Sequence, residues 1–276
     1  WDFYSQPPIS VFSHVWGYNP GTLYDEAIAP DERLMAWRCI TVLSALAIVI
    51  LLNCFDRLNL EQTKKLLVTG LLAFCFYHLD QQIGSHYLYR VDRDVLAEKL
   101  SVIREAPGLV IHLPTEIHPS RADAILEDHR FHLDRLKEKL EMDEFQTIHS
   151  YVYTNAKMKG SLLGGRNTMF AKPWLGEIHI HGLEIPHSVV AHELVHAVAA
   201  PLGTSILQVT TRFGIIPNMG LIEGFAEAFT TPLTLLALIA AANSEAITDW
   251  VDVDASTETV TPSITALMIS GRAPPS

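Results

Sequence analysis

The residues best suited to chemistry in this chain lie in one short segment, His192-Glu193-Leu194-Val195-His196. On an α-helix, residues four apart share a face, so both imidazoles are able to bind one metal ion while Glu193 projects beside them. The alternative is a pair of surface histidines on an ordinary helix. It fits poorly, because two rings and a carboxylate in so apolar a segment would lose hydration without gaining a partner. The segment therefore predicts a zinc-binding helix.

The flanking residues predict the limits of this helix. Pro186 suits the first turn of a helix, and Pro201 and Gly203 would end it. Apolar residues between these limits predict that the helix is largely buried: Val189, Val190, Leu194, Val195 and Val198.

A catalytic zinc ion usually takes three protein ligands and leaves a fourth position for water, so a third ligand is required. The downstream segment 220–229 predicts a second helix with Glu223 and Glu227 four residues apart on one face. We expect Glu223 to be the third ligand and Glu227 to accept the other ring N–H of a ligating histidine. Which of the two carboxylates binds the metal stays open. Their apolar flanks argue against the alternative, a solvated pair of acids on a helix surface.

The sequence HELVH, followed by LIEGFAEAF, resembles the gluzincin branch of the zinc metallopeptidases, over the range from about Leu109 to Phe229. The resemblance implies that His192, His196 and Glu223 bind Zn²⁺ and that Glu193 is the general base. One departure is the spacing, because the 26 residues between His196 and Glu223 are more than the best-known members have.

The chemistry that follows is hydrolysis of a peptide bond in a peptide or protein substrate by a metal-activated water. Glu193 would take the proton of that water and return it to the leaving amine. Stabilisation of the developing oxyanion usually needs a further donor, for which His179, His181 and Tyr153 are candidates.

The segments before the metal-binding helix predict an α+β fold. Ser120 is placed to cap a helix over 121–141, whose leucines recur at helical spacing. Four short segments read as strands: 109–113, 147–154, 168–172 and 177–181. This order is similar to the small sheet that precedes the active-site helix of gluzincins.

The resemblance also implies an edge strand that binds the substrate in extended form, and Glu177–His181 is the candidate. His179 and His181 share one face of this strand, so they would be able to chelate a metal or stabilise an oxyanion. In the alternative interpretation they form the polar face of an amphipathic strand, with Ile178 and Ile180 turned to the core.

A hydrophobic content of 49% directs attention to membrane segments. Cys39–Phe55 is a run of 17 residues without a charge, and Leu66–Leu79 is a shorter run of 14. Together they predict two transmembrane helices, the alternative being two buried core helices. The cationic residues of the short connection, Arg57, Lys64 and Lys65, would place it in the cytoplasm and the peptidase domain on the extracytoplasmic side.

The whole chain of 276 residues is expected to have five parts. They are an extramembrane N-terminal segment at 1–37, a transmembrane hairpin at 38–80, a helical linker at 81–106, a zinc metallopeptidase domain at 107–243 and a poorly ordered tail at 244–276. Aromatic residues of the first part suit a membrane interface. Because the chain begins with Trp1 and shows no signal peptide, we expect it to be a piece of a longer protein.

Composition argues against other classes of function. A net charge of −11 without a basic block argues against nucleic acid as a partner. Cys39, Cys54 and Cys75 fall in the two apolar segments without CxxC spacing, so neither a disulfide framework nor a cysteine-ligated zinc is indicated. Substrate preference and oligomeric state are left open.

Two rival functions remain at the level of sequence. In one, zinc is a structural staple of a non-catalytic membrane protein that docks a partner, which would require a fourth protein ligand. In the other, the chain is an intramembrane protease of the site-2 type. Against the second, the HELVH segment follows a charged α+β region, and no Asp in an Asn-Pro motif follows it to act as third ligand.

Overall fold

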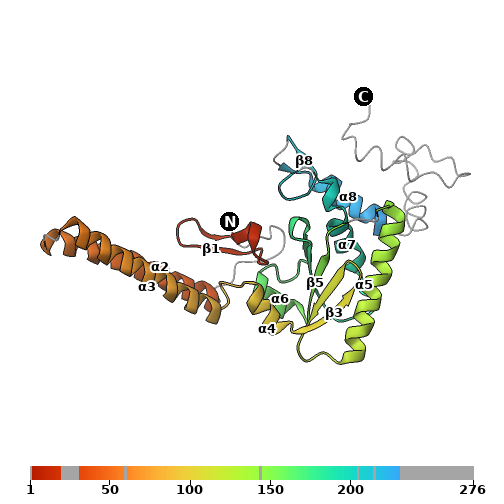
Figure 1. The fold of residues 1–276 in the computed structure, drawn as a ribbon, viewed down its shortest axis with the longest axis horizontal. Coiled ribbons are helices and arrows are strands. Elements are labelled where there is room, and N and C mark those ends of the chain that lie inside the picture. The colour runs from red at the N-terminus through yellow and green to blue at the C-terminus, as the bar shows by residue number, and fades with distance from the viewer. Residues whose placement is uncertain are drawn as a thin grey trace, which may run out of the picture.

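The computed structural model describes residues 2–19, 31–58, 61–142, 145–203, 205–213 and 216–230. Its centre is a mixed sheet of five strands with helices packed against it (Figure 1). The predicted apolar segment 232–243 and the predicted tail 244–276 lie outside the described residues. A mixed α/β fold in which a small sheet precedes the metal-binding helices is therefore confirmed.

The strand order is β3-β4-β5-β7-β6. β4, β5 and β7 are parallel to one another, whereas β3 and β6 pair antiparallel at the two edges. The bounds are Val102–Ala106 for β3, Leu109–Leu113 for β4, Ile148–Tyr153 for β5, Phe170–Lys172 for β6 and Glu177–His181 for β7. The predicted strand 177–181 is thus interior, and the prediction that it is an edge strand is wrong. The edge on that side is β6.

Alternation along the strands sends one set of side chains to a core that they share with helices α5 (Pro119–Leu140) and α7 (Val190–Val198). Ile111 of β4, Ile178 of β7 and Leu194 of α7 are fully buried there. α5 begins one residue earlier than predicted, and His118 rather than Ser120 caps it. Pro119 explains this, because a proline that lacks an N–H fits the first helical position.

The expected helical linker at 81–106 is only partly helical. α4 (Arg93–Lys99) begins where the Asp92 carboxylate accepts a hydrogen bond from the Val95 amide, but Val102–Ala106 forms β3. The alternating burial of those five residues and their pairing with β4 account for the difference. Local charge content suggested a helix, whereas pairing with a neighbouring strand decided the conformation. Two-residue turns then connect β3 directly to β4.

Helices α2 (Glu32–Leu58) and α3 (Gln62–His86) form an antiparallel hairpin that projects from the sheet (Figure 1). In the described part of the chain, one helix is long and apolar enough to cross a membrane, namely α2 over Glu32–Phe55. The prediction of two transmembrane helices is therefore wrong for α3. Its uncharged run between Lys65 and Asp80 has 14 residues, about 21 Å of helix, which is less than the roughly 30 Å of a hydrocarbon layer.

Residues 2–19 form α1 (Asp2–Ser5) and a small hairpin of β1 (Val11–Ser13) and β2 (Gly17–Asn19). The buried Lys172 side chain of β6 holds this N-terminal segment, because its Nζ donates hydrogen bonds to three backbone carbonyls. These belong to Phe3 at 2.9 Å, Gln6 at 2.7 Å and Pro8 at 2.9 Å. Burial lowers the pKa of Lys172 to about 7.

Replacing Lys172 with Met is expected to release the N-terminal segment, because three carbonyls lose their donor at once. Each lost hydrogen bond of this kind costs about 1–3 kcal/mol when the group stays buried. Chymotrypsin should then cut after Phe3 and Tyr4 at least about tenfold faster, since 1.4 kcal/mol corresponds to a factor of ten in the exposed population. In the matched control Lys139→Met, which removes a hydrogen bond to the Phe229 carbonyl instead, this rate should not change. Equal cleavage in both variants would show that Lys172 does not hold the segment.

Candidate metal centre

Helix α7 and helix α8 (Met219–Thr230) bring the three predicted ligands together. His192 Nε2 lies 3.1 Å from His196 Nε2 and 3.1 Å from Glu223 Oε2. The third side of this triangle, from His196 Nε2 to Glu223 Oε2, is 3.7 Å. Among the residues that the structure describes, these three are the one group of histidine, cysteine or acidic side chains that converges in this way.

The spacing of these atoms fits a zinc ion. Zinc–nitrogen and zinc–oxygen bonds of roughly 2.0–2.2 Å in a tetrahedral arrangement place ligand atoms about 3.3–3.6 Å apart. The three distances in the structure, 3.1, 3.1 and 3.7 Å, lie around this value. Two imidazoles and one carboxylate are also a donor set found at catalytic zinc ions. The residues present therefore fit the metal that the sequence predicts.

Packing of α7 determines which of its side chains face the metal centre. Val190, Leu194, Val195 and Val198 are fully buried in the core beneath the helix. His192 and His196 therefore lie on the opposite side and stay partly exposed to solvent. Because α7 and α8 pack against one another, Glu223 is carried to the same opening. The predicted limits differ in one respect, since α7 begins at Val190 and Pro186 lies before its first turn.

The two carboxylates of the site have different environments. Glu193 is only 5% exposed, and burial raises the pKa of its carboxyl to about 7. Hydrogen bonding to the imidazoles of His196 and His192 lowers the pKa of Glu223 below its ordinary value. Glu223 is thus held as an anion, the form in which a carboxylate binds a metal.

Glu227 lies on the other side of the His192 ring. Its Oε2 is 3.8 Å from Nδ1 of His192, the ring nitrogen that faces away from Glu223. A carboxylate at this position is suited to orient the imidazole and to select the tautomer that leaves Nε2 free for a metal. In this geometry Glu223 has the position of the ligand, and Glu227 has the position of the supporting carboxylate.

His179, His181 and Tyr153 are not brought to the metal centre. Ile178 and Ile180 occupy the face of β7 that packs with α7, so alternation sends the two histidines to the opposite face. Tyr153 lies on that same opposite face, where its hydroxyl and Nδ1 of His179 are 3.1 Å apart. The interpretation of His179 and His181 as a polar strand face is confirmed, and their predicted role at the substrate edge strand is wrong.

The opposite face of the sheet is a packed layer. The His179 ring stacks between Tyr151 and Phe170, with centroids 4.9 and 4.8 Å away, and burial lowers the pKa of His179 to about 4. Beside it, the buried Glu177 carboxylate accepts hydrogen bonds from Arg93 of α4 at 2.7 and 2.9 Å. This layer positions α4 against the sheet and leaves these rings no access to a substrate at α7.

A pocket next to the metal centre was missed by reasoning from the sequence. It has a volume of about 250 Å³ and adjoins the ligand His196. The stretch between His196 and Glu223 supplies much of its wall, since that stretch folds into the 3₁₀ helix η2 (Ala200–Leu202) and the hairpin of β8 (Thr211–Arg212) and β9 (Ile216–Pro217). The wall is mostly apolar and includes Pro173, Leu202, Val209, Leu221, Ile222 and Phe225. The unusual length of this stretch was the one signal of an added feature.

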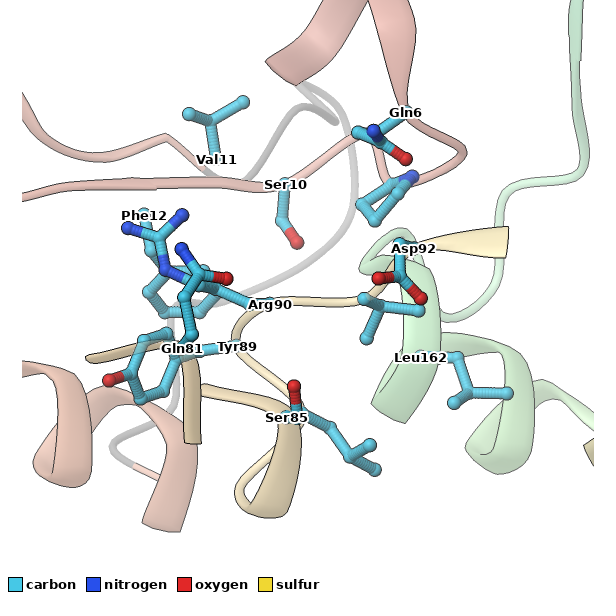
Figure 2. A pocket seen from close by; sticks show the side chains of 13 residues that line it. Gln6, Ser10, Val11, Phe12, Gln81, Ser85, Tyr89, Arg90, Asp92 and Leu162 are labelled. Carbon is cyan, nitrogen blue, oxygen red and sulfur yellow. The ribbon is translucent and has the colours of Figure 1, made fainter. Parts of the chain in front are cut away.

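A second cavity, of about 160 Å³, lies at the foot of the α2–α3 hairpin (Figure 2). Residues of the N-terminal segment, the end of α3 and the connection 88–92 line it, and none of the three predicted ligands does. Its charged side chains already have partners within the protein. The Arg90 guanidinium binds the Asp80 carboxylate at 2.6 Å, and Asp92 caps α4. This cavity is a junction between hairpin and sheet, not a second reactive site.

The chemistry of the metal centre is thus defined by its own donor atoms: two imidazole nitrogens and a carboxylate at zinc distances, a buried Glu193 beside them, and an apolar pocket that adjoins His196. Comparison of the chain with protein-family models, with curated proteins and with solved structures finds no match.

Proposed function

We propose that the protein is a zinc-dependent peptidase whose metal is held by His192, His196 and Glu223. The observation that carries the proposal is the convergence of these three side chains at zinc distances next to Glu193. In the described residues the group contains three ligands, and a fourth position toward solvent suits water and substrate. A structural staple would need a fourth protein ligand, so catalysis is the better interpretation of the site.

Zinc, when bound, would supply Lewis acidity for the substrate carbonyl and would lower the pKa of a coordinated water. Glu193 is the group that takes a proton from the attacking water, holds it on its carboxyl and delivers it to the nitrogen of the leaving amine. Its position next to His192 on α7 places it at the ligand cluster. Glu227 keeps the imidazole of His192 in the tautomer that presents Nε2.

The strand nearest to α7 at the sheet edge is β6, and we propose it as the element that binds the substrate backbone. β6 pairs with β7 on one side, and within the described residues its other side has no strand partner. An extended peptide is able to add to such an edge through main-chain hydrogen bonds. Ala171 and Met169 pack into the core that also contains Leu194 of α7, which brings the edge close to the metal helix.

The placement of α7 distinguishes this proposal from an intramembrane protease. α7 packs against α5, α8 and the sheet, whereas the apolar helix α2 packs against α3 in the projecting hairpin (Figure 1). α2 is also not the core helix of a soluble domain, because only 11% of its most apolar window is buried within the protein. We propose that α2 anchors the protein in a lipid bilayer and that the metal centre lies outside the bilayer, on the extracytoplasmic side.

The proposed activity is tested by measuring metal content and peptide cleavage together. The full chain, purified in detergent, should contain about one zinc ion per molecule by atomic absorption. It should cut a mixed peptide library, lose the activity in a chelator such as 1,10-phenanthroline and regain it when zinc is added back. A parent protein that binds no zinc after reconstitution would exclude the whole class of function.

The apolar pocket predicts preference for an apolar side chain next to the cleaved bond. Burying a Leu or Phe side chain is worth about 1.5–3 kcal/mol, roughly a ten- to hundredfold gain in kcat/KM over a small polar residue. Leu202→Glu, which places a carboxylate in the pocket wall, should reverse this order in favour of Lys or Arg. Ile206→Glu is the control, since Ile206 belongs to the same connecting stretch but does not line the pocket. An unchanged cleavage profile in Leu202→Glu would rule out the pocket as a substrate site.

A further inference from the structure

The turn that joins β1 and β2 presents two apolar side chains to the outside of the molecule. Val15 is 82% exposed and Trp16 is 92% exposed. The backbone of the turn is well defined, because the amides of Val15 and Trp16 donate to Ser13 Oγ at 3.3 and 3.1 Å, and Gly17 adopts a φ of 92° that favours glycine. The protein thus holds a large aromatic ring in the most exposed position of an ordered turn.

His14 fixes this turn beside the foot of the helical hairpin (Figure 1). Its Nδ1 is 2.7 Å from the Thr41 hydroxyl of α2, and its Nε2 is 3.0 Å from the Asp80 carboxylate of α3. Phe12 of β1 packs on Trp37 of α2, with ring centroids 5.6 Å apart. The turn is therefore level with Thr41 along the hairpin axis.

Thr41 marks the point where the surface of the hairpin changes from polar to apolar. Arg38, which is exposed and nearly one turn earlier, is the last charged residue of α2 before the 17 uncharged residues Cys39–Phe55. On α3, the exposed Tyr77 lies three residues beyond Asp80 toward the tip, about 4.5 Å along the axis. A cation, a tryptophan and a tyrosine at the border of an apolar surface are the side chains that favour the headgroup region of a membrane.

We propose that Trp16, with Val15 and Tyr77, docks in the headgroup region of a lipid bilayer and sets the height of the sheet domain above the membrane. This inference rests on the proposed membrane placement of α2. A second protein copy is a poorer occupant, because two side chains on one turn offer far less than the roughly 800 Å² per partner of a stable interface. A lipid surface needs only the ring and its neighbours, and it is continuous with the exposed apolar surface of α2.

The experiment places a fluorescent probe at the turn in the full chain, with Cys39, Cys54 and Cys75 replaced by Ala. Trp16→Cys and the control Ile206→Cys are labelled with an environment-sensitive fluorophore and reconstituted into phosphatidylcholine vesicles. Ile206 is also strongly exposed, at 79%, but belongs to the stretch between the metal ligands. At position 16 we expect a blue shift and strong quenching by lipid that is spin-labelled near the headgroup, and at position 206 we expect neither.

Equal emission and equal quenching at the two positions would overturn the proposal, and so would shielding of position 16 that depends on protein concentration and not on lipid. The unlabelled chain gives an independent measurement that leaves the cysteines in place. Trp16→Phe should remove a lipid-quenchable part of the tryptophan fluorescence, and undiminished quenching would contradict the docking. Flotation of the vesicles separates the two levels of the inference. A chain that does not float with them refutes the membrane placement of α2 itself, while peptide cleavage is scored independently.

Discussion

Replacing Glu193 with Gln is expected to lower kcat for peptide cleavage by roughly 10²–10⁴-fold, the range that a general base contributes. The amide keeps the size and the polarity of the carboxyl but is unable to accept the proton of the attacking water. Zinc content should stay that of the parent, because Glu193 is not one of the three converging side chains. The measurement is kcat and KM on one peptide, with zinc quantified in the same preparation.

Because Glu193 is buried, a loss of activity through misfolding has to be excluded. The Gln variant should unfold at a temperature close to that of the parent, and it should still bind a peptide substrate with a similar Kd. Full activity in a zinc-loaded Glu193→Gln protein would refute the assignment of the base. Loss of zinc together with loss of activity would instead make Glu193 a part of the metal site.

The second large effect is expected for the metal ligands. Removing one imidazole by His196→Ala should weaken zinc binding roughly a thousandfold. This follows because the 10–16 kcal/mol of a four-ligand zinc site, shared equally, gives about 3–4 kcal/mol per ligand. His192→Ala and Glu223→Ala should behave alike. Competition with a chromophoric chelator of known affinity measures the zinc Kd directly, without any reference to cleavage.

Glu227 supplies the control for this series. Glu227→Gln should weaken zinc binding by only about 10–100-fold, the effect of losing a carboxylate that orients a ligand from behind. The expected order, with Glu223→Gln clearly worse than Glu227→Gln, follows from the two distances to His192: 3.1 Å from Nε2 to Glu223 and 3.8 Å from Nδ1 to Glu227. The reverse order would exchange the roles of the two carboxylates.

Local sequence patterns predicted the parts of the fold that depend on neighbouring residues. The spacing of His192 and His196 placed both on one face of a helix, and the alternating residues 109–113 formed a strand as expected. Periodicity of this kind is set by backbone geometry within a few residues. The predicted Ser120 cap was wrong by two residues, because the conformational preference of Pro119 outweighed a better capping side chain.

The composition of the apolar segments was informative in the same way but to different degrees. The 17 uncharged residues of α2 are enough to make it a candidate membrane helix. The 14 residues available in α3 are not, because Lys65 and Asp80 limit the run on both sides. Counting apolar residues alone overestimated the second segment, since the length of a span is fixed by the thickness of the hydrocarbon layer.

By itself, the sequence determined the identity of the metal ligands His192 and His196, the neighbouring Glu193 and the helices that carry them, because these depend on spacing along one chain segment. Only the tertiary structure decided that β6 and not β7 lies at the edge, that His179 and His181 face away from α7, and that Glu223 rather than Glu227 meets both imidazoles. It also decided that the stretch after His196 closes a pocket beside the metal centre. Strand order, strand faces and pocket walls arise from contacts between segments far apart in the chain, and packing selects among pairings that the local sequence leaves open.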